Sequence, residues 1–76
     1  MDIKTLAGRV KQLAKDETFL YIIESIKKDQ ANIFLNPNSS LEERESSHEI
    51  IRGLSKIEGC MASILTDEAI FDRKHH

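Results

Sequence analysis

A dense cluster of turn-forming residues, Asn36–Ser40, divides this 76-residue chain into two helical halves. Within the cluster, Pro37 lacks a backbone N–H and disfavours helical geometry at the residue before it, so no helix continues through this point. Ser40 and Glu43 match a capping box, in which a serine hydroxyl and a glutamate side chain satisfy free N–H groups at a helix start, and Ser39 and Glu42 match the same box one residue earlier. The cluster therefore predicts where the chain reverses and where the next helix begins.

The residues before the turn predict a helix over residues 17–35. Asp16 can accept backbone N–H bonds at its start, and Glu17 suits the positive end of the helix dipole. At about 100° per residue, one face collects Gln30 and most of the large apolar side chains. These apolar residues are Phe19, Ile22, Ile23, Ile26, Ile33 and Phe34. We expect this face to meet the helix that follows the turn.

The residues after the turn predict a helix over residues 41–65. Its apolar residues repeat at alternating steps of four and three, a heptad pattern typical of helices that cross at a shallow angle. The members of this predicted seam are Ile50, Leu54, Ile57, Met61 and Ile64, joined by Leu65. The Thr-Asp-Glu run at 66–68 has the pattern of a new helix start. Residues 66–76 are therefore expected to form a short helical turn carrying Ile70 and Phe71, followed by a frayed polar tail.

A short basic amphipathic helix is predicted within residues 1–15. Its apolar stripe consists of Ile3, Leu6, Val10 and Leu13. Gly8 lowers the intrinsic stability of this helix by about 1 kcal/mol relative to alanine, so we expect it to form only when docked. Docking on the other helices or on a neighbouring subunit is favoured over a membrane or nucleic acid, because the basic residues are few and no aromatic anchor accompanies them.

The overall composition indicates one small helical domain, residues 1–76. Charged residues make up 32% of the chain and hydrophobic residues 39%, and no apolar run approaches the roughly 18 residues that a membrane span requires. The single cysteine, Cys60, excludes an intrachain disulfide and suits a reducing compartment. Residues 1–15 carry a charge of +3 against −5 for the rest, and the net charge of −2 argues against a general nucleic-acid coat.

No arrangement of residues in the sequence indicates catalysis. The pattern Glu45-x-x-His48, with Glu24 as a further carboxylate, would formally suit a carboxylate-bridged di-iron bundle formed by two copies. On a helical projection, however, these side chains point about 140–160° away from the predicted apolar faces, whereas ligands of a buried metal must point inward. We therefore expect a solvated charged face, with no metal, no cofactor and no enzymatic activity.

The segment around the turn resembles a family of phage proteins. Phe19 opens an apolar helix, and the polar turn is followed by the pattern Arg44-Glu45-x-x-His48-x-x-x-Arg52-x-Leu54. Over residues 16–65 this arrangement resembles small helical-hairpin proteins encoded among the structural and packaging genes of tailed bacteriophages. The resemblance implies a non-enzymatic component of the virion or of its assembly that works as part of an oligomer, and it implies no catalytic residues.

Together these patterns predict an all-α protein, an antiparallel helical hairpin of residues 17–35 and 41–65 that self-associates. A two-helix scaffold cannot hide all of its apolar side chains, so those off the inner faces are expected to form a partner interface. They are Leu6, Val10, Leu13, Leu20, Tyr21, Leu35, Ile51, Ile70 and Phe71. The expected partners are further copies of the chain and other assembly proteins, in the bacterial host cytoplasm or the virion, with no membrane.

A second hypothesis places the chain in another class, that of small regulators or inhibitors. Such a protein would bind a protein or a nucleic acid through its basic N-terminal helix. The contact residues would then be Arg9, Lys11 and Lys15. Salt-dependent binding to DNA would distinguish this hypothesis from the first, because contacts to phosphates release counterions.

Overall fold

The computed structural model describes residues 1–75, and every regular element within that range is helical. Helix α1 spans Ile3–Lys15, α2 spans Glu17–Leu35 and α3 spans Leu41–Lys74. The predicted all-α class is confirmed. The predicted bounds of α2 and the predicted start of α3 also agree with the structure.

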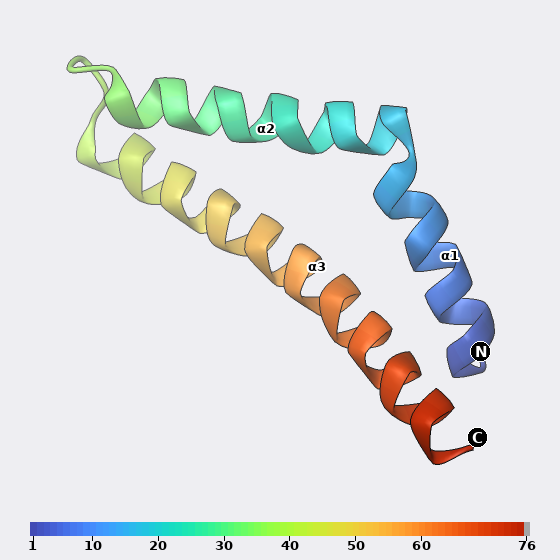
Figure 1. The fold of residues 1–76 in the computed structure, drawn as a ribbon. Coiled ribbons are helices and arrows are strands. Elements are labelled where there is room, and N and C mark those ends of the chain that lie inside the picture. The colour runs from blue at the N-terminus through green and yellow to red at the C-terminus, as the bar shows by residue number, and fades with distance from the viewer. Residues whose placement is uncertain (76) are drawn as a thin grey trace.

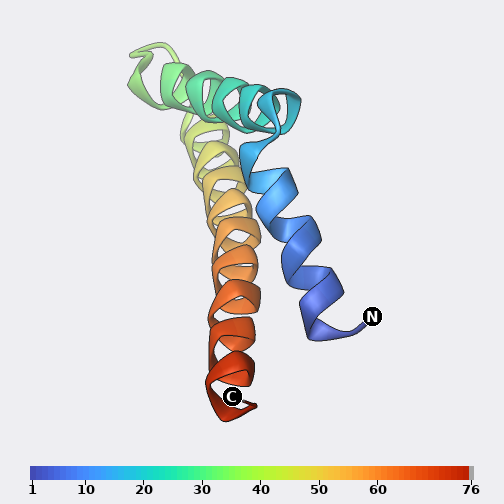
Figure 2. The same cartoon turned by 45° about the vertical axis from the view of Figure 1, so that its right-hand side comes forward.

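The three helices outline a triangle in which α3 is the longest side (Figure 1). α2 leads into the turn and α3 leads away from it, and the distance between the two helices grows away from the turn. α1 forms the third side of the triangle. Turned by 45°, the structure shows α1 descending beside the C-terminal half of α3 while α2 crosses above (Figure 2). The start of α1 lies beside the end of α3, where Lys4 forms an ion pair with Asp72. The N-terminal helix therefore docks within its own chain.

Each helix starts at a capping side chain, of which Asp16 and Ser40 were predicted and Asp2 was not. Asp2 accepts a hydrogen bond from the backbone N–H of Thr5 at 2.9 Å, and Asp16 accepts one from Phe19 at 2.7 Å. Asp16 alone separates α1 from α2, and its extended backbone, with ψ of 118°, turns the chain between them. The corner of the triangle at α1 and α2 is thus produced by one capping aspartate.

The capping box at Ser40 and Glu43 is present at the end of the turn. The N–H of Glu43 donates to Ser40 Oγ at 3.1 Å, and the N–H of Ser40 donates to Glu43 Oε1 at 3.0 Å. Asn36 Oδ1 accepts the N–H of Asn38 at 2.9 Å, which tightens the reversal, and Arg44 donates to the Asn36 carbonyl at 3.2 Å. Hydrogen bonds made by side chains therefore stabilise both ends of the turn.

The predicted end of the third helix at residue 65 is wrong. α3 continues without a break to Lys74, so residues 66–68 do not start a new turn and Asp72 to Lys74 are not a frayed tail. The hydroxyl of Thr66 donates to the Ala62 carbonyl one turn back, at 3.1 Å, and a hydroxyl bonded in this way leaves the helix continuous. His76, which was assigned to the polar tail, lies outside the described residues.

The buried side chains lie in a line along α3 instead of around one centre. The apolar core is small and consists of Ala7, Val10, Ile23 and Leu54. On α3 the packed residues form what we call the inner seam: Ser47, Leu54 and Glu68 are buried, and Ile51, Met61 and Leu65 are half-buried. Among the described residues no large side chain is fully enclosed. The structure therefore depends on a thin layer of contacts.

The predicted inner faces are only partly correct. On α2, Ile23 and Gln30 are buried, whereas Ile22 and Phe34 remain about half exposed. On α3, Leu54 is buried, but Ile50 and Ile57 are 44% and 48% exposed. Ile50 and Ile57 are exposed because α3 packs through the inner seam, which contains Ser47 and Glu68 and lies on a different side of the helix.

The molecule is far from spherical. It measures 57 × 22 × 17 Å, with a radius of gyration of 16.6 Å. A compact domain of this length has a radius of gyration of about 11 Å. The elongated outline leaves much of each helix in contact with solvent.

Candidate functional site

The most distinctive surface feature is the number of large apolar side chains left exposed. They occur on all three helices and include Leu13, Leu20, Tyr21, Ile22, Phe34, Leu35, Leu41, Ile50, Ile57, Ile70 and Phe71. Tyr21 and Leu35 are 74% and 79% exposed. Monomeric proteins seldom expose large contiguous apolar areas, and such areas mark sites of association.

The structure divides the residues predicted for a partner interface into three groups by their exposure. Six of them are exposed: Leu13, Leu20, Tyr21, Leu35, Ile70 and Phe71. Leu6 and Ile51 are half-buried. Val10 is only 7% exposed, which corrects its assignment to a partner surface, because the docking of α1 within the chain covers it. The exposed six are distributed over all three helices.

One row of residues on α3 is largely exposed, although three of its four members, Ile50, Ile57 and Ile64, were predicted to face the interior. Ile50, Ile57, Ile64 and Phe71 are spaced by seven residues and therefore lie along one side of the helix. We call these four residues the outer row. Ile50, Ile57 and Phe71 are 44%, 48% and 38% exposed, and Ile64 is half-buried. At about 100° per residue, the outer row lies about 80° around α3 from the inner seam.

Small residues alternate with the outer row along the same side of α3. Gly53 and Cys60 are exposed and fall between the large side chains. A Cβ atom added at Gly53 would meet no atom within 4 Å, so packing inside the described chain does not require glycine there. The outer row and these small residues therefore form a largely exposed side of α3.

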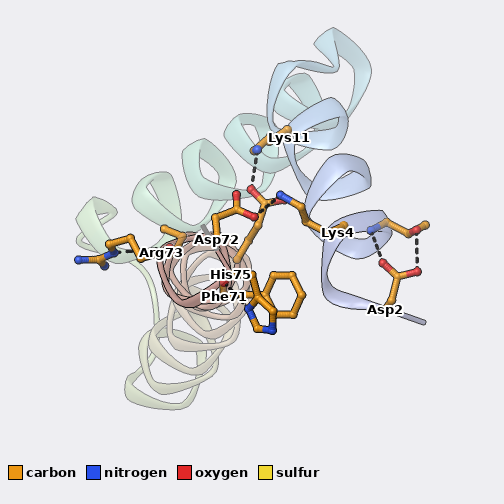
Figure 3. Close-up of polar contacts among 10 residues, drawn as sticks. Asp2, Lys4, Lys11, Phe71, Asp72, Arg73 and His75 are labelled. Atoms are coloured by element: carbon orange, nitrogen blue, oxygen red, sulfur yellow. Dashed lines mark hydrogen bonds and ion pairs between the residues drawn. The ribbon is translucent and has the colours of Figure 1, made fainter.

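The basic N-terminal helix uses two of its lysines inside the chain. Lys4 binds Asp72, and Lys11 donates to Glu68 Oε1 at 2.8 Å (Figure 3). The hydrogen bond with Asp72 raises the pKa of Lys4. Glu68 is buried beside α1, so this pair links α1 to the inner seam.

The basic residues predicted for nucleic-acid contact are therefore not equivalent. Lys11 is paired with Glu68, whereas Arg9 and Lys15 are exposed on α1. Lys4 and Lys11 join α1 to α3 through ion pairs, a role that was not predicted from the sequence. Their spacing of seven residues, which places them on one line of α1, was the signal that could have indicated it.

Polar contacts also join α2 to α3. Ser47 Oγ donates to the Gln30 carbonyl at 2.9 Å, and Lys27 pairs with Glu58 at 2.9 Å. The hydrogen bond with Glu58 raises the pKa of Lys27. Within residues 1–75, the side-chain oxygen of buried Gln30 has no hydrogen-bond partner. Polar contacts therefore accompany the buried apolar side chains where each flanking helix meets α3.

The surface of residues 1–75 also has shallow hollows along α3. A shallow groove of about 360 Å³ lies between α2 and α3 and is lined on its apolar side by Phe34, Leu35 and Ile51. In the part of the chain that the structure describes, no three His, Cys, Asp or Glu side chains come together as a metal-binding group. Over the same range, none of the helices has the length and apolar character needed to cross a membrane.

Phe71, the last residue of the outer row, has an aromatic neighbour in its own helix. The imidazole of His75 stacks on the Phe71 ring, with the ring centres 4.1 Å apart and an interplanar angle of 20° (Figure 3). His75 Nδ1 also lies 2.8 Å from the Phe71 carbonyl oxygen. These contacts define the C-terminal end of the outer row.

Comparison with protein-family profiles, with curated protein sequences and with solved structures found no match to this chain.

Proposed function

We propose that this protein is a non-enzymatic structural or assembly protein that acts by associating with itself through its helices. The observation that carries the proposal is the exposed area. The chain exposes 6021 Å², whereas a compact monomer of this mass exposes about 4,700 Å². The excess, about 1,300 Å², is larger than the roughly 800 Å² that one partner loses in an interface of standard size.

Stability leads to the same proposal. A domain of this length typically unfolds with a free energy of about 4–11 kcal/mol, most of it from burial of apolar surface. Here the buried apolar residues of the described chain are Ala7, Val10, Ile23 and Leu54. Such a thin core gives a marginal monomer, and association would stabilise the fold by covering the exposed isoleucine, leucine and phenylalanine side chains.

The proposed setting is a bacteriophage virion or its packaging and assembly machinery, with other assembly proteins as further partners. This part of the proposal depends on the resemblance of residues 16–65 to small phage hairpin proteins, in which the two helices around the turn form the unit that associates. The host cytoplasm or the virion is then where the protein works.

Light scattering coupled to size-exclusion chromatography tests self-association directly. We expect a mass that is a multiple of 8.7 kDa at micromolar concentration and above. A mass of one chain at every concentration up to the millimolar range would refute the proposal. Dilution should also lower the thermal midpoint, because the stability of an oligomer depends on protomer concentration.

A second candidate function is that of a small regulator that binds a nucleic acid or an acidic protein through α1. It is favoured by the exposed side chains of Arg9 and Lys15 and by the local charge of +3 in residues 1–15. Reversing Arg9 and Lys15 to glutamate leaves the pair between Lys11 and Glu68 intact. A loss of salt-sensitive DNA binding in this variant, with its mass unchanged, would favour the regulator, and no DNA binding by the wild type would exclude the nucleic-acid form of it.

A further inference from the structure

We propose that a second copy of this chain packs along the outer row, antiparallel to α3, about a two-fold axis near Cys60. This inference rests on the proposed self-association and names the surface that carries it. Three observations support it: the symmetry of the outer row about its own centre, the small residues between its members, and the charges beside it.

The outer row is symmetric about the middle of its own length. Ile57 and Ile64 lie equally far from a point next to Cys60, and Ile50 and Phe71 lie equally far from the same point. A two-fold interface repeats each contact, so that residue i meets residue j and residue j meets residue i. Two antiparallel copies therefore place Ile57 opposite Ile64 of the second copy, and Ile50 opposite Phe71.

The small residues allow the two helices to approach closely. In heptad packing, each large side chain enters a space between residues of the facing helix. Gly53 and Cys60 leave such spaces on this side of α3, and within residues 1–75 nothing lies within 4 Å of the Cβ position of Gly53. In the antiparallel register Gly53 comes opposite residue 68 of the second copy, about one helical turn before Phe71, so the missing side chain leaves space beside the Phe71 ring.

The charges beside the outer row favour the antiparallel direction. Lys56 and Asp67 are exposed and flank its solvent side. In a parallel pair, Asp67 would face Asp67 of the second copy, and like charges that face each other destabilise an interface. In the antiparallel register Asp67 lies instead near Lys56 of the second copy. The two-fold axis repeats this contact, so one pair of opposite charges lies on each side of the axis.

Cross-linking through Cys60 tests the position of the axis, since it is the only cysteine in the chain. We expect a short-arm bismaleimide to convert most of the wild-type protein into covalent dimers. The matched control carries Cys60→Ser and Tyr21→Cys, which moves the thiol to a site on α2 where the native side chain is 74% exposed. We expect the control to give only a small fraction of the wild-type yield.

The outcomes of this experiment separate the two proposals. If light scattering shows a dimer but Cys60 cross-links no better than the control, the outer row is not the interface, although self-association stands. If both proteins have the mass of one chain and neither cross-links, self-association itself fails. A high yield from Cys60 alone supports both.

A second pair of variants tests the direction of packing in a Cys60→Ser background. One variant carries Ile50→Cys and the other carries Phe71→Cys, and residues 50 and 71 of one helix are about 30 Å apart. The antiparallel arrangement predicts efficient cross-linking when the two variants are mixed and little when either is alone. The reverse result, efficient cross-linking of each variant with itself and little in the mixture, would overturn the proposed direction.

A charge introduced into the outer row tests its energetic contribution. Ile57→Glu and Ile22→Glu change the same residue type at nearly equal exposure, 48% and 49%, on α3 and α2. We expect Ile57→Glu to weaken dimerisation by at least about tenfold, because it would place a carboxylate in the apolar interface, and Ile22→Glu to change it less than about threefold. Equal effects of the two substitutions would overturn the proposal. Far-UV circular dichroism of both variants controls for loss of helix, and the wild-type cross-linking decides if Ile57→Glu does not fold.

Discussion

Leu54 is the largest apolar side chain that the fold buries on α3, and its truncation tests whether the thin core along this helix determines stability. It is 7% exposed and belongs to the inner seam. The perturbation is Leu54→Ala. Its matched control is Leu41→Ala on the same helix, where the native side chain is 71% exposed.

The expected cost of Leu54→Ala follows from the burial. The substitution removes three carbon atoms, each contributing about 0.8 kcal/mol when fully buried, which gives a transfer cost of about 2.2 kcal/mol. The cavity contribution is small, because no large side chain among the described residues is fully enclosed and the neighbours can collapse into the space. We expect a loss of about 2–3 kcal/mol in the free energy of unfolding, and less than about 0.5 kcal/mol for Leu41→Ala.

The assay is urea and thermal unfolding followed by circular dichroism at several protein concentrations, so that association and folding are separated. For a domain of this size the expected loss lowers the melting temperature by about 10–20 °C. If Leu54→Ala costs no more than Leu41→Ala at equal concentration, α3 does not pack through the inner seam and the assignment of the core is wrong.

Three further predictions concern the polar groups of the fold. Ser40→Ala removes the hydroxyl that accepts the N–H of Glu43 and should cost about 1 kcal/mol in urea unfolding, whereas a cost near zero would show that the capping box contributes nothing to stability. Gln30→Met replaces a buried amide whose oxygen has no partner within residues 1–75 and should raise the free energy of unfolding by about 1 kcal/mol, so a clear decrease would contradict that description. The backbone N–H of Ser40, and then its side chain, lower the pKa of Glu43, so the stabilisation is present above the unfolded pKa and is lost as the pH falls through the folded pKa. Unfolding measured from neutral to acidic pH should therefore show a larger decrease in the wild type than in Glu43→Gln, and parallel curves would exclude this contribution.

The ends of the helices were largely predictable, because they depend on a few neighbouring residues. Asp16 and the capping box of Ser40 and Glu43 act on N–H groups within three residues, and each is found where its pattern predicts. The C-terminal end of α3 was mispredicted for a related reason. The hydroxyl of Thr66 has two local options, and it bonds back to Ala62 inside the helix instead of capping a new one.

The docking of α1 was beyond local rules. It depends on contacts between residues far apart in the chain, such as Lys11 with Glu68 at 2.8 Å. The spacing of Lys4 and Lys11 places them on one line of α1, but it does not specify which helix that line meets. The ion pairs with α3 explain why a basic amphipathic segment lies inside its own chain, and they remove Lys11 from the set of free cations that the sequence suggested for an external partner.

Local sequence signals account for the three helices and for the reversal at the turn, because capping and the lack of an N–H at proline act over a few residues. They do not account for the side of α3 that faces inward. α3 carries two apolar rows with the same heptad period, one containing Leu54 and the other containing Ile50 and Ile57, and the period alone cannot distinguish them. The choice depends on where α1 and α2 pack, through contacts between residues far apart in the chain. Val10, Ile23 and Leu54 are buried there beside the polar contacts of Ser47 with α2 and of Glu68 with α1, and the outer row is left largely exposed.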